Sequence, residues 1–220
     1  MNGIKKMIKN AKNQKIKLIG ITGKMGAGKS LFSFFLKKKG IFVYSSDQRG
    51  KILMNQVKII KQNVIKYFGK DSYKKDKINK TYLSEIVFKN PIALKLLCTI
   101  VHPWISLDFK QWMSSIIKIQ KQTLYVIKES AILFESRSYK ECDFIITITS
   151  PKKNMIERII KRDNLNEEQI IDRLKNQISN KKREKKSNFV IKNYLSTYHL
   201  QKESDRIHKL LEKLIIQKNQ

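Results

Sequence analysis

The residues with the most specific chemistry lie in the stretch GITGKMGAGKSLF, from position 20 to position 32. Gly23 to Ser30 match the pattern G-x-x-x-x-G-K-[ST], between an apolar segment and a segment with helical spacing. Glycines let backbone N–H groups point inward around an anion, and the helix that follows adds the positive end of its dipole. Lys29 has the reach to contact β- and γ-phosphates, and the Ser30 hydroxyl is a ligand type that Mg²⁺ accepts. The stretch therefore predicts a loop that binds the phosphates of a nucleoside triphosphate.

Carboxylates follow or close two of the predicted strands. Asp47 comes directly after GIFVYSS, where it is either a turn or helix-cap residue or an acid that accepts the proton of an attacking hydroxyl group. Glu129 ends the run TLYVIKE, where it is either a solvated acid or a group that holds a water bound to Mg²⁺. Residue type and position leave both pairs of alternatives open.

Arginines late in the chain have a spacing that suits phosphate contacts. Arg158 and Arg162 are four residues apart and share one helix face, and Arg173 and Gln177 repeat that spacing on the next predicted helix. The planar guanidinium group fits the non-bridging oxygens of a phosphoryl group in transfer. Spacing alone favours the other reading, a set of solvated or structural arginines. The run NKKREKK at 180–186 is typical of a solvated face, with a role in holding a pyrophosphate group or a lid as the alternative.

The elements that must position these groups alternate between strands and helices, which predicts a parallel sheet covered on both faces. Strands are predicted at residues 16–22, 41–46, 123–130, 143–150 and 188–193. Helices are predicted at residues 30–40, 51–68, 81–90, 91–102, from 103, from 151, from 166 and at 201–216, with a polar loop at 69–80. The residue before a proline disfavours helical geometry, so one helix is predicted to end at His102 and the next to begin at Pro103.

Composition limits the class of protein. A chain of 220 residues with 41% hydrophobic residues can bury one substantial core. No uninterrupted apolar run approaches the ~18 residues of a membrane span, and the basic segment 1–15 lacks the apolar centre of a secretory signal. Cys98 and Cys142 lie far apart without a CxxC pair, which favours reduced cytoplasmic thiols over a metal site.

The formal net charge of +29 has two explanations. It fits a nucleic-acid-binding surface, and it also fits a general over-use of Lys, Ile and Asn of the kind that codon drift in an AT-rich genome produces. The lysines are scattered over the whole chain, which favours drift. No helix-turn-helix, zinc-finger or RNP pattern appears in the sequence. Charge alone therefore does not decide the function.

The order of motifs resembles the dephospho-coenzyme A kinase family over nearly the whole chain, from Ile16 to the last helix. IGITGKMGAGKS is similar to the phosphate loop of that family, and GIFVYSSDQRGKIL to its pattern lG..viDAD.ia. LSEIVFKNPIALKLLCTIVHPWI resembles the diagnostic pattern L...VF.d...l..L..i.HP.i. ESAILFES stands in place of D.PLLfE, RIIKRDNLNEEQIIDRLKNQ resembles R...Rd.ls.e....R...Q, and SNFVIKN resembles aDyvI.N.

The chain departs from the family pattern at several positions. Lys24 stands in place of a usual Gly, and Leu31 in place of a usual Thr. Asn188 replaces an Asp, and Leu195 occupies a position where Gly often follows the Asn. Ser45 replaces the first Asp of the second motif, which leaves fewer carboxylates to hold Mg²⁺. None of these changes removes an expected catalytic group.

The resemblance implies a single α/β domain with the P-loop fold of nucleoside-monophosphate kinases, in which helices flank a parallel sheet of about five strands. The implied parts are a nucleotide-binding core at 16–70 and 120–200, a helical substrate insert at 71–119, a lid at 151–186 and a closing helix at 201–216. The implied reaction is Mg²⁺-dependent transfer of the γ-phosphoryl group of ATP to the ribose 3′-hydroxyl of dephospho-coenzyme A. We expect a cytoplasmic monomer or weak homo-oligomer with no specific nucleic-acid or membrane partner.

The resemblance also implies roles for individual residues. Asp47, Lys29 and Arg158 are the implied catalytic residues, and the implied contacts of ATP are Gly26, Ala27, Gly28, Lys29, Ser30 and Leu31. Arg158, Arg162 and Arg173 are implied lid contacts of the phosphates, and Ser30 is the implied Mg²⁺ ligand, with Glu129 acting through water. His102 and Glu129 are weaker candidates for substrate contacts, since His102 also suits a packing role at a helix junction. Glu135 matches a family position and otherwise fits an anchor of the following turn.

Two other functions stay open at this point. One is phosphorylation of a different small molecule or nucleotide by an enzyme of the same fold. The other is a nucleic-acid-binding protein that keeps a phosphate loop for regulation, which nothing beyond charge supports. A switch GTPase is disfavoured because no NKxD motif for guanine appears in the sequence.

Overall fold

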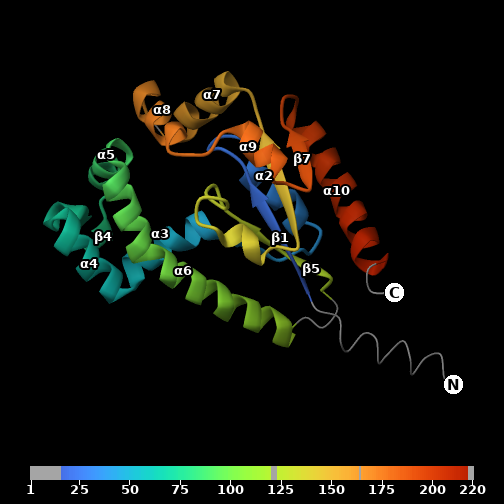
Figure 1. Cartoon of the computed structure of the whole chain (residues 1–220), viewed down its shortest axis with the longest axis horizontal. Helices are drawn as coiled ribbons and strands as arrows, with labels where there is room; N and C mark the ends of the chain where they lie inside the picture. The colour runs from blue at the N-terminus through green and yellow to red at the C-terminus, as the bar shows by residue number, and fades with distance from the viewer. Residues whose placement is uncertain (1–15, 120–122, 164, 218–220) are drawn as a thin grey trace.

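A computed structural model describes residues 16–119, 123–163 and 165–217, so the predicted basic tail at 1–15 lies outside the described residues. A sheet of five parallel strands forms the centre, in the order β2-β5-β1-β6-β7 (Figure 1). The strands are β1 Lys17–Thr22, β2 Val43–Ser45, β5 Tyr125–Glu129, β6 Phe144–Thr149 and β7 Phe189–Lys192. The predicted five-stranded parallel sheet is confirmed.

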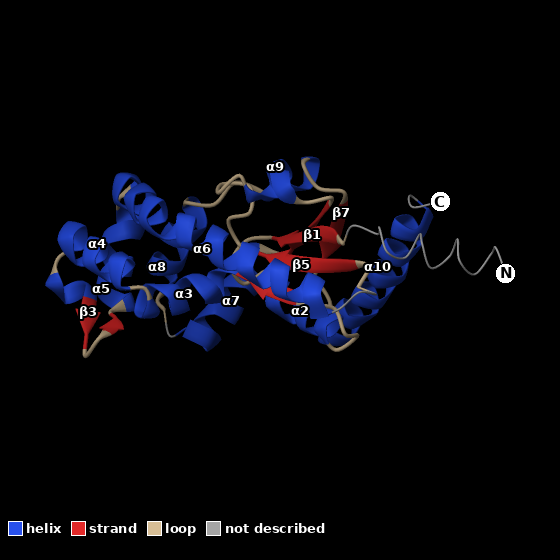
Figure 2. Ribbon diagram, turned by 90° about the horizontal axis from the view of Figure 1, so that it is seen from below, coloured by secondary structure: helices blue, strands red, loops and turns tan. Residues whose placement is uncertain are grey.

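Helices cover both faces of this sheet, so its three central strands are buried almost throughout. Helices α2 (Lys29–Lys37) and α10 (Thr197–Gln217) lie side by side on one face, and α9 (Asn180–Lys185) lies on the other (Figure 2). The main core joins these layers through apolar side chains of the strands, α2 and α10, among them Ile19, Ile146, Phe32, Leu36, Ile207 and Leu211. The sheet is thereby a rigid base for the loops at its edge.

A second group of helices stands beside the sheet and is called the helical lobe here, residues 46–119. It contains α3 (Ser46–Gln56), α4 (Lys58–Phe68), α5 (Lys80–Lys89) and α6 (Pro91–Ile119). The lobe has its own apolar cluster, made by Leu53, Ile60, Val64, Phe68, Leu83, Val87 and Val101. Two further helices, α7 (Lys152–Asp163) and α8 (Glu167–Lys175), lie at the top of Figure 1 and form a third side of the molecule.

The predicted single helix at 51–68 is wrong, because the chain turns at Val57. This residue has extended dihedral angles, φ −90° and ψ 109°, and it is both the C-cap of α3 and the N-cap of α4. Its N–H donates to the Leu53 carbonyl, and its own carbonyl accepts from Lys61 N. The apolar stripe runs on through both helices into one cluster, so periodicity gave no sign of the turn.

The predicted helix end at His102 is also wrong, since α6 runs from Pro91 to Ile119 with Pro103 inside it. A proline costs one helical hydrogen bond, and tertiary packing outweighs that loss here. Val101 and Ile105, on either side of the proline, both pack against α3 at Gly50, where an added Cβ would lie 3.1 Å from the Ile105 Cδ1 atom. Gly50 therefore allows the close approach that holds α6 in one piece.

A small hairpin replaces part of the predicted polar loop at 69–80. Strands β3 (Tyr73–Lys74) and β4 (Lys77–Ile78) pair antiparallel after a short 3₁₀ turn. Lys75 and Asp76 between them both have positive φ, 47° and 62°, as a tight two-residue turn requires. Short strands in a lysine-rich run carry little apolar signal, which is why the sequence did not predict them.

Helix α6 is long and apolar enough, by length and composition, to cross a membrane. Among the described helices it alone has this length and composition. Helices in the core of other proteins have them too, so they are weak evidence for a membrane span. Its side chains Val101, Phe109 and Ile116 are buried against the lobe and the sheet. Tyr44 and Arg49 both bond to Asp108 of this helix, with 2.7 Å between Tyr44 Oη and Asp108 Oδ2. The helix thus connects lobe and sheet in this structure.

Candidate active site

The carboxyl ends of three neighbouring strands meet at one edge of the sheet. In the pairing register, Glu129 of β5 stands opposite Ile21 of β1 and opposite Ser45 of β2. Because the strands are parallel, the segments that follow them leave the sheet at the same edge. The phosphate loop follows β1, and Asp47 follows β2. Strand order therefore brings Asp47 and Glu129, about 20 and about 100 residues after the loop, to the side of the loop.

The phosphate loop has a backbone that requires its glycines. Gly26 and Gly28 have φ of 78° and 104°, a region that disfavours residues with a Cβ atom. A Cβ at Gly23 would lie 2.2 Å from the Ile148 carbonyl oxygen, and one at Gly28 would lie 2.3 Å from Asn193 Nδ2. That same Asn193 amide donates to the Ala27 carbonyl at 2.9 Å, so the residue directly after β7 holds the loop in place.

Lys29 and Ser30 begin helix α2 directly after the loop, as the motif predicts. The Lys29 side chain is buried, and its Nζ donates to the Lys24 carbonyl at 3.2 Å. Burial lowers the pKa of Lys29, while the nearby carboxylates of Asp47 and Glu129 raise it. A desolvated ammonium group is a strong attractor for phosphate oxygens.

The pair Ser30 and Glu129 has the chemistry of a Mg²⁺ site. Ser30 Oγ donates to Glu129 Oε1 at 2.7 Å, and Glu129 is only 4% exposed. A hydroxyl and a carboxylate oxygen are the hard ligands that Mg²⁺ prefers, with water and substrate phosphates completing the octahedron. No cluster of three or more His, Cys, Asp or Glu side chains occurs among the described residues, so a metal here would rely on such outside ligands. The pair fits a substrate-bound Mg²⁺ ion.

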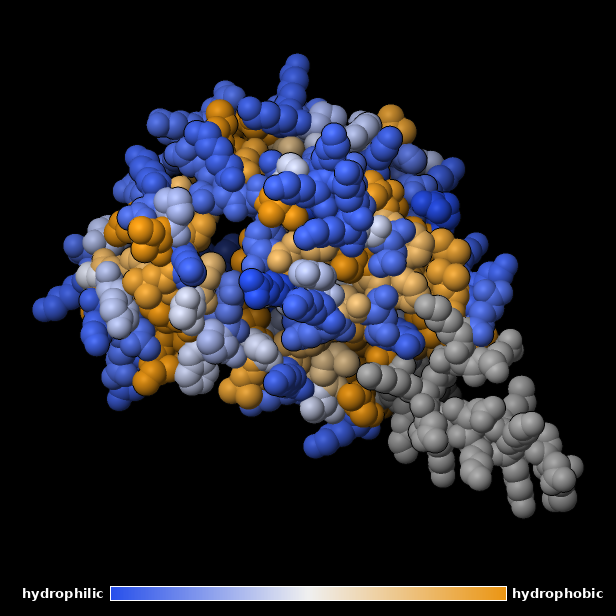
Figure 3. Space-filling view, in the orientation of Figure 1, coloured by the Kyte–Doolittle hydropathy of each residue, from blue (hydrophilic) through white to orange (hydrophobic). Residues whose placement is uncertain are grey.

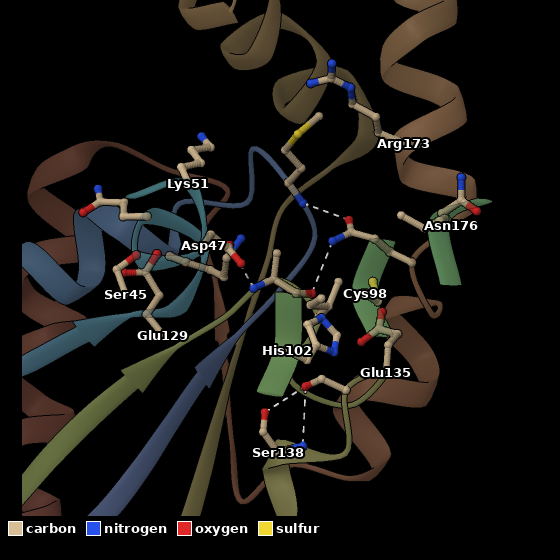
Figure 4. Close-up of a pocket in the computed structure, with 18 of the residues that line it drawn as sticks. Ser45, Asp47, Lys51, Cys98, His102, Glu129, Glu135, Ser138, Arg173 and Asn176 are labelled. Atoms are coloured by element: carbon tan, nitrogen blue, oxygen red, sulfur yellow. Dashed lines mark hydrogen bonds between the residues drawn. The ribbon is translucent and has the colours of Figure 1, made fainter. Parts of the chain in front are cut away.

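Asp47 lies in the first turn of α3 and is exposed to the cavity beside the loop. It does not cap its own helix, because Ser45 is the N-cap residue. Its Oδ2 atom instead accepts a hydrogen bond from the amide of Ala131, just past β5, at 3.2 Å. Figure 4 shows this contact as a dashed line, with Glu129 and Ser45 on the same side of the cavity.

Two cavities adjoin the loop. The larger, of about 1270 Å³, separates the sheet from the helical lobe, and a hollow is visible between these parts in Figure 3. Its walls include Lys29, Ser30, Asp47, Glu129 and, from α6, Cys98 and His102. The smaller, of about 230 Å³, lies on the other side of the loop, between Leu31, Arg158 and Leu195. Lys29 and Ser30 border both cavities, so the loop stands between two binding spaces.

The three arginines predicted to be lid contacts of the phosphates occupy different positions. Arg158 lies against the loop, since its Nη1 donates to the Gly26 carbonyl at 3.3 Å and to Ser150 Oγ at 3.1 Å. Arg162 borders both cavities and pairs with the neighbouring Asp163 through two hydrogen bonds, with its side chain 59% exposed. Arg173 borders the larger cavity, its guanidinium 4.8 Å from the centre of the Phe88 ring, and burial lowers its pKa. All three border one cavity or the other.

His102 lines the larger cavity from the middle of α6, one helical turn from Cys98. Figure 4 shows both side chains across the cavity from Asp47. Burial lowers the pKa of His102. Since α6 does not end there, the predicted helix junction at His102 is wrong, and the half-buried side chain both packs within the helix and borders the cavity.

Several residues near the site had no role from the sequence. The run at 180–186 was predicted to be solvated, yet Arg183 within it is fully buried and donates to Thr22 Oγ1, the Ala131 carbonyl and Glu135 Oε1. Burial lowers the pKa of Arg183, and Glu135 raises it. Gln177 lies past the end of α8, not on it, and bonds to the loop amide of Met25. Nothing in the sequence distinguishes Arg183 from the other cations of this run, so no signal there could have found it.

The chain matches the family model described as dephospho-CoA kinase over residues 17–198. A dephospho-CoA kinase of Bacteroides fragilis is 35% identical over 176 residues, which is 80% of this chain and 83% of the relative. One from Fusobacterium nucleatum is 34% identical over 192 residues, 87% and 96% of the two chains.

Solved structures agree with these matches. A dephospho-CoA kinase from Campylobacter jejuni superposes with a TM-score of 0.63 at 28% identity, covering 89% of this chain and 97% of that one. A structure from Thermus thermophilus shares the fold with a TM-score of 0.71 at 23% identity, covering 90% and 97%. From the family match and these relatives, together with a phosphate loop that faces a strand-end carboxylate, it follows that the chain belongs to the dephospho-CoA kinase family.

Proposed function

We propose that Asp47, Lys29 and Arg158 carry the reaction of this family in the present chain, the phosphorylation of dephospho-CoA by ATP in the last step of coenzyme A synthesis. The observation that supports the proposal is the larger cavity, which has Lys29 and Ser30 of the phosphate loop on one wall and Asp47 on another. A triphosphate tail on the loop and an acceptor alcohol beside Asp47 therefore share one cavity.

The two substrates enter from different sides in this proposal. The triphosphate lies along the amides of Gly26 to Leu31, and the nucleoside of ATP occupies the smaller cavity near Leu195. Dephospho-CoA occupies the larger cavity, whose volume of about 1270 Å³ suits a long ligand and whose far wall is α6. His102 on that wall contacts the acceptor substrate.

The chemical step is an in-line phosphoryl transfer. Asp47 accepts the proton of the ribose 3′-hydroxyl as its oxygen forms a bond to the γ-phosphorus. The bond from that phosphorus to the bridging oxygen of ADP breaks, and ADP leaves with the electron pair. Lys29 holds the β- and γ-phosphate oxygens, and Arg158 at the rim of the loop stabilises the charge on the transferred group. Arg162 and Arg173 exchange their present partners for phosphate oxygens when α7 and α8, the helices of the predicted lid at 151–186, close, while the contacts of Gln177 and Arg183 stay in place.

A Mg²⁺ ion fits beside Ser30, with Glu129 holding one of its waters. When bound, it neutralises charge on the β- and γ-phosphates. Ser30 and Glu129 would hold the ion, and their mutual hydrogen bond keeps both side chains beside the loop.

The other partners follow from the same proposal. The reaction takes place in the cytoplasm, where ATP is supplied, by a monomer or weak homo-oligomer. No specific nucleic-acid or membrane partner is proposed. A gel-shift assay at physiological salt checks the nucleic-acid part, because binding that arises from net charge alone is weak and falls steeply with salt.

A coupled assay of ADP release tests the proposed function. The purified chain is offered ATP and Mg²⁺ with dephospho-CoA, adenosine, AMP or shikimate-like alcohols as acceptors, and the product is identified by mass. We expect turnover with dephospho-CoA at least a hundredfold faster than with the other acceptors, since those lack the groups that reach α6. Equal turnover with adenosine or AMP would contradict the assignment of the larger cavity to dephospho-CoA.

A further inference from the structure

The turn after β5 is held in place by two side chains from the segment that returns from α8. Ala131 is in this turn, and its carbonyl accepts hydrogen bonds from Arg183 Nη1 at 3.0 Å and Gln177 Nε2 at 3.2 Å. Its amide N–H points the other way, to Asp47 Oδ2 at 3.2 Å. The peptide groups on both sides of one Cα atom are therefore fixed, one by the returning segment and one by the acid.

Arg183 connects several segments of the chain through its guanidinium group. Its guanidinium group is fully buried, and its other contacts are Thr22 Oγ1 at 2.9 Å, Glu135 Oε1 at 2.8 Å and the Ile178 carbonyl at 3.4 Å. Thr22 is the last residue of β1, directly before the phosphate loop. A buried charge is costly unless it is paired and hydrogen-bonded, so these contacts need to hold together as a set.

Gln177 adds a link from the same turn to the phosphate loop. Its Oε1 accepts from the Met25 amide at 3.1 Å, while its Nε2 donates to Ala131. Figure 4 shows these bonds as dashed lines between the loop and the turn, continuing to Asp47. The phosphate loop and the carboxylate of Asp47 are thus both tied to one residue, Ala131, the loop through its carbonyl and the carboxylate through its amide.

From this chain of contacts we propose that Arg183 is a positioning residue for the Asp47 carboxylate. It acts through the Ala131 turn, with Gln177 setting the distance between that turn and the phosphate loop. The inference rests on the proposed role of Asp47. A carboxylate that takes a proton from an alcohol must lie within hydrogen-bond reach of it, and a displacement of about 1 Å lowers turnover by about a hundredfold. Arg183 touches neither substrate in this proposal.

Arg183→Lys tests the inference. Lysine keeps the positive charge but has a single nitrogen, so it cannot reproduce contacts that now start from Nη1, Nη2 and Nε of a planar fork. We expect kcat for dephospho-CoA phosphorylation to fall by about tenfold to a hundredfold, with the KM of ATP and of dephospho-CoA within about twofold of the unaltered protein. Arg206→Lys, the same substitution at an exposed arginine of α10 that borders neither cavity, is the matched control and should leave kcat unchanged.

A double-mutant cycle separates positioning from general destabilisation. If Arg183 acts through Asp47, then Arg183→Lys lowers the residual kcat of Asp47→Asn by less than about twofold. An equal drop in both backgrounds overturns the proposal, because a structural loss of active molecules is independent of Asp47. An unchanged kcat in Arg183→Lys also overturns it.

A second variant covers the case in which Arg183→Lys does not fold. Gln177→Glu keeps the acceptor for the Met25 amide but loses the donor to Ala131, and Gln177 is only half-buried. The same drop in kcat and the same dependence on Asp47 are expected for it, and their absence overturns the proposal. Hydrogen exchange of the Ala131 amide is a readout besides activity: we expect faster exchange in either variant, and unchanged exchange contradicts the contact. An unaltered protein without activity on dephospho-CoA refutes the proposed function instead, while the exchange result still decides whether Arg183 holds the turn.

Discussion

Replacing the carboxylate of Asp47 by an amide isolates its capacity to accept a proton. Among the described residues, Asp47 accepts one hydrogen bond, from the Ala131 amide to Oδ2 at 3.2 Å. The carbonyl oxygen of an asparagine can accept that same bond, so Asp47→Asn should leave the turn, the fold and the phosphate loop in place. What is lost is the base, which in general acid–base catalysis contributes about 10²- to 10⁴-fold.

The expected loss in kcat is therefore about a hundredfold or more, which corresponds to about 2.7 kcal/mol of transition-state stabilisation at about 1.36 kcal/mol per factor of ten. Binding of ATP should change little, because the contacts of the triphosphate come from the loop and Lys29. The assay is ADP release with saturating ATP and dephospho-CoA, combined with a direct measurement of ATP affinity by calorimetry. Thermal unfolding of the variant checks that its fold is intact.

Asp71→Asn is the matched control, since Asp71 is an exposed acid in the 3₁₀ turn of the helical lobe, away from both cavities. It should turn over like the unaltered protein. If Asp47→Asn retains kcat within about twofold of the unaltered protein, Asp47 is not the base. If it loses ATP affinity and kcat in equal measure, the carboxylate serves nucleotide binding and the reasoning from its place in the cavity is refuted.

Three further predictions concern the metal, the lid and the pH dependence of stability. Glu129→Gln keeps an acceptor for Ser30 but removes the negative charge, so the Mg²⁺ concentration for half-maximal activity should rise by about tenfold or more. A Mg²⁺ titration at fixed ATP that matches the unaltered protein would exclude Glu129 from holding the metal. Arg158→Ala should lower kcat by about a hundredfold while the KM of ATP changes by less than tenfold, measured by steady-state kinetics; an effect confined to KM would remove it from the transition state. Burial lowers the pKa of His102 below its ordinary 6.5, so the unfolded chain binds a proton more readily than the folded chain. The free energy of unfolding is therefore unaffected by this group above pH 6.5 and decreases as the pH falls below it. His102→Asn should thus narrow the gap between the free energies of unfolding in urea at pH 7.5 and pH 5.5, and an unaltered gap would contradict a desolvated neutral imidazole.

The sequence by itself determined the local features of this protein. Gly23 to Ser30 specify a phosphate loop because their backbone angles and donor groups are set by residue type within eight positions. The five strands were predicted because buried parallel strands are short runs of apolar, largely β-branched residues bounded by turns. The capping box at Asn166 and Gln169 was likewise readable, and both of its hydrogen bonds are present.

The tertiary structure decided the features that depend on competition between local preference and packing. Pro103 opposes a continuous helix locally, and close contact of α6 with Gly50 outweighs it. Val57 lies within an unbroken apolar stripe, yet the chain turns there because α3 and α4 both need to reach one cluster. Periodicity carries no information on either outcome.

The site shows the same division. The identities of Asp47 and Glu129 followed from their place at strand ends, but their approach to one loop follows from the strand order β2-β5-β1, which sets residues far apart in the chain side by side. Arg183 is the clearest case: in the sequence it is one cation in a run of seven mostly basic residues, and only the fold gives it a buried place with Thr22, Ala131 and Glu135. The residue type determines which chemical group is present at a position. Whether a charged group is buried depends on partners from other parts of the chain, which only the fold brings together.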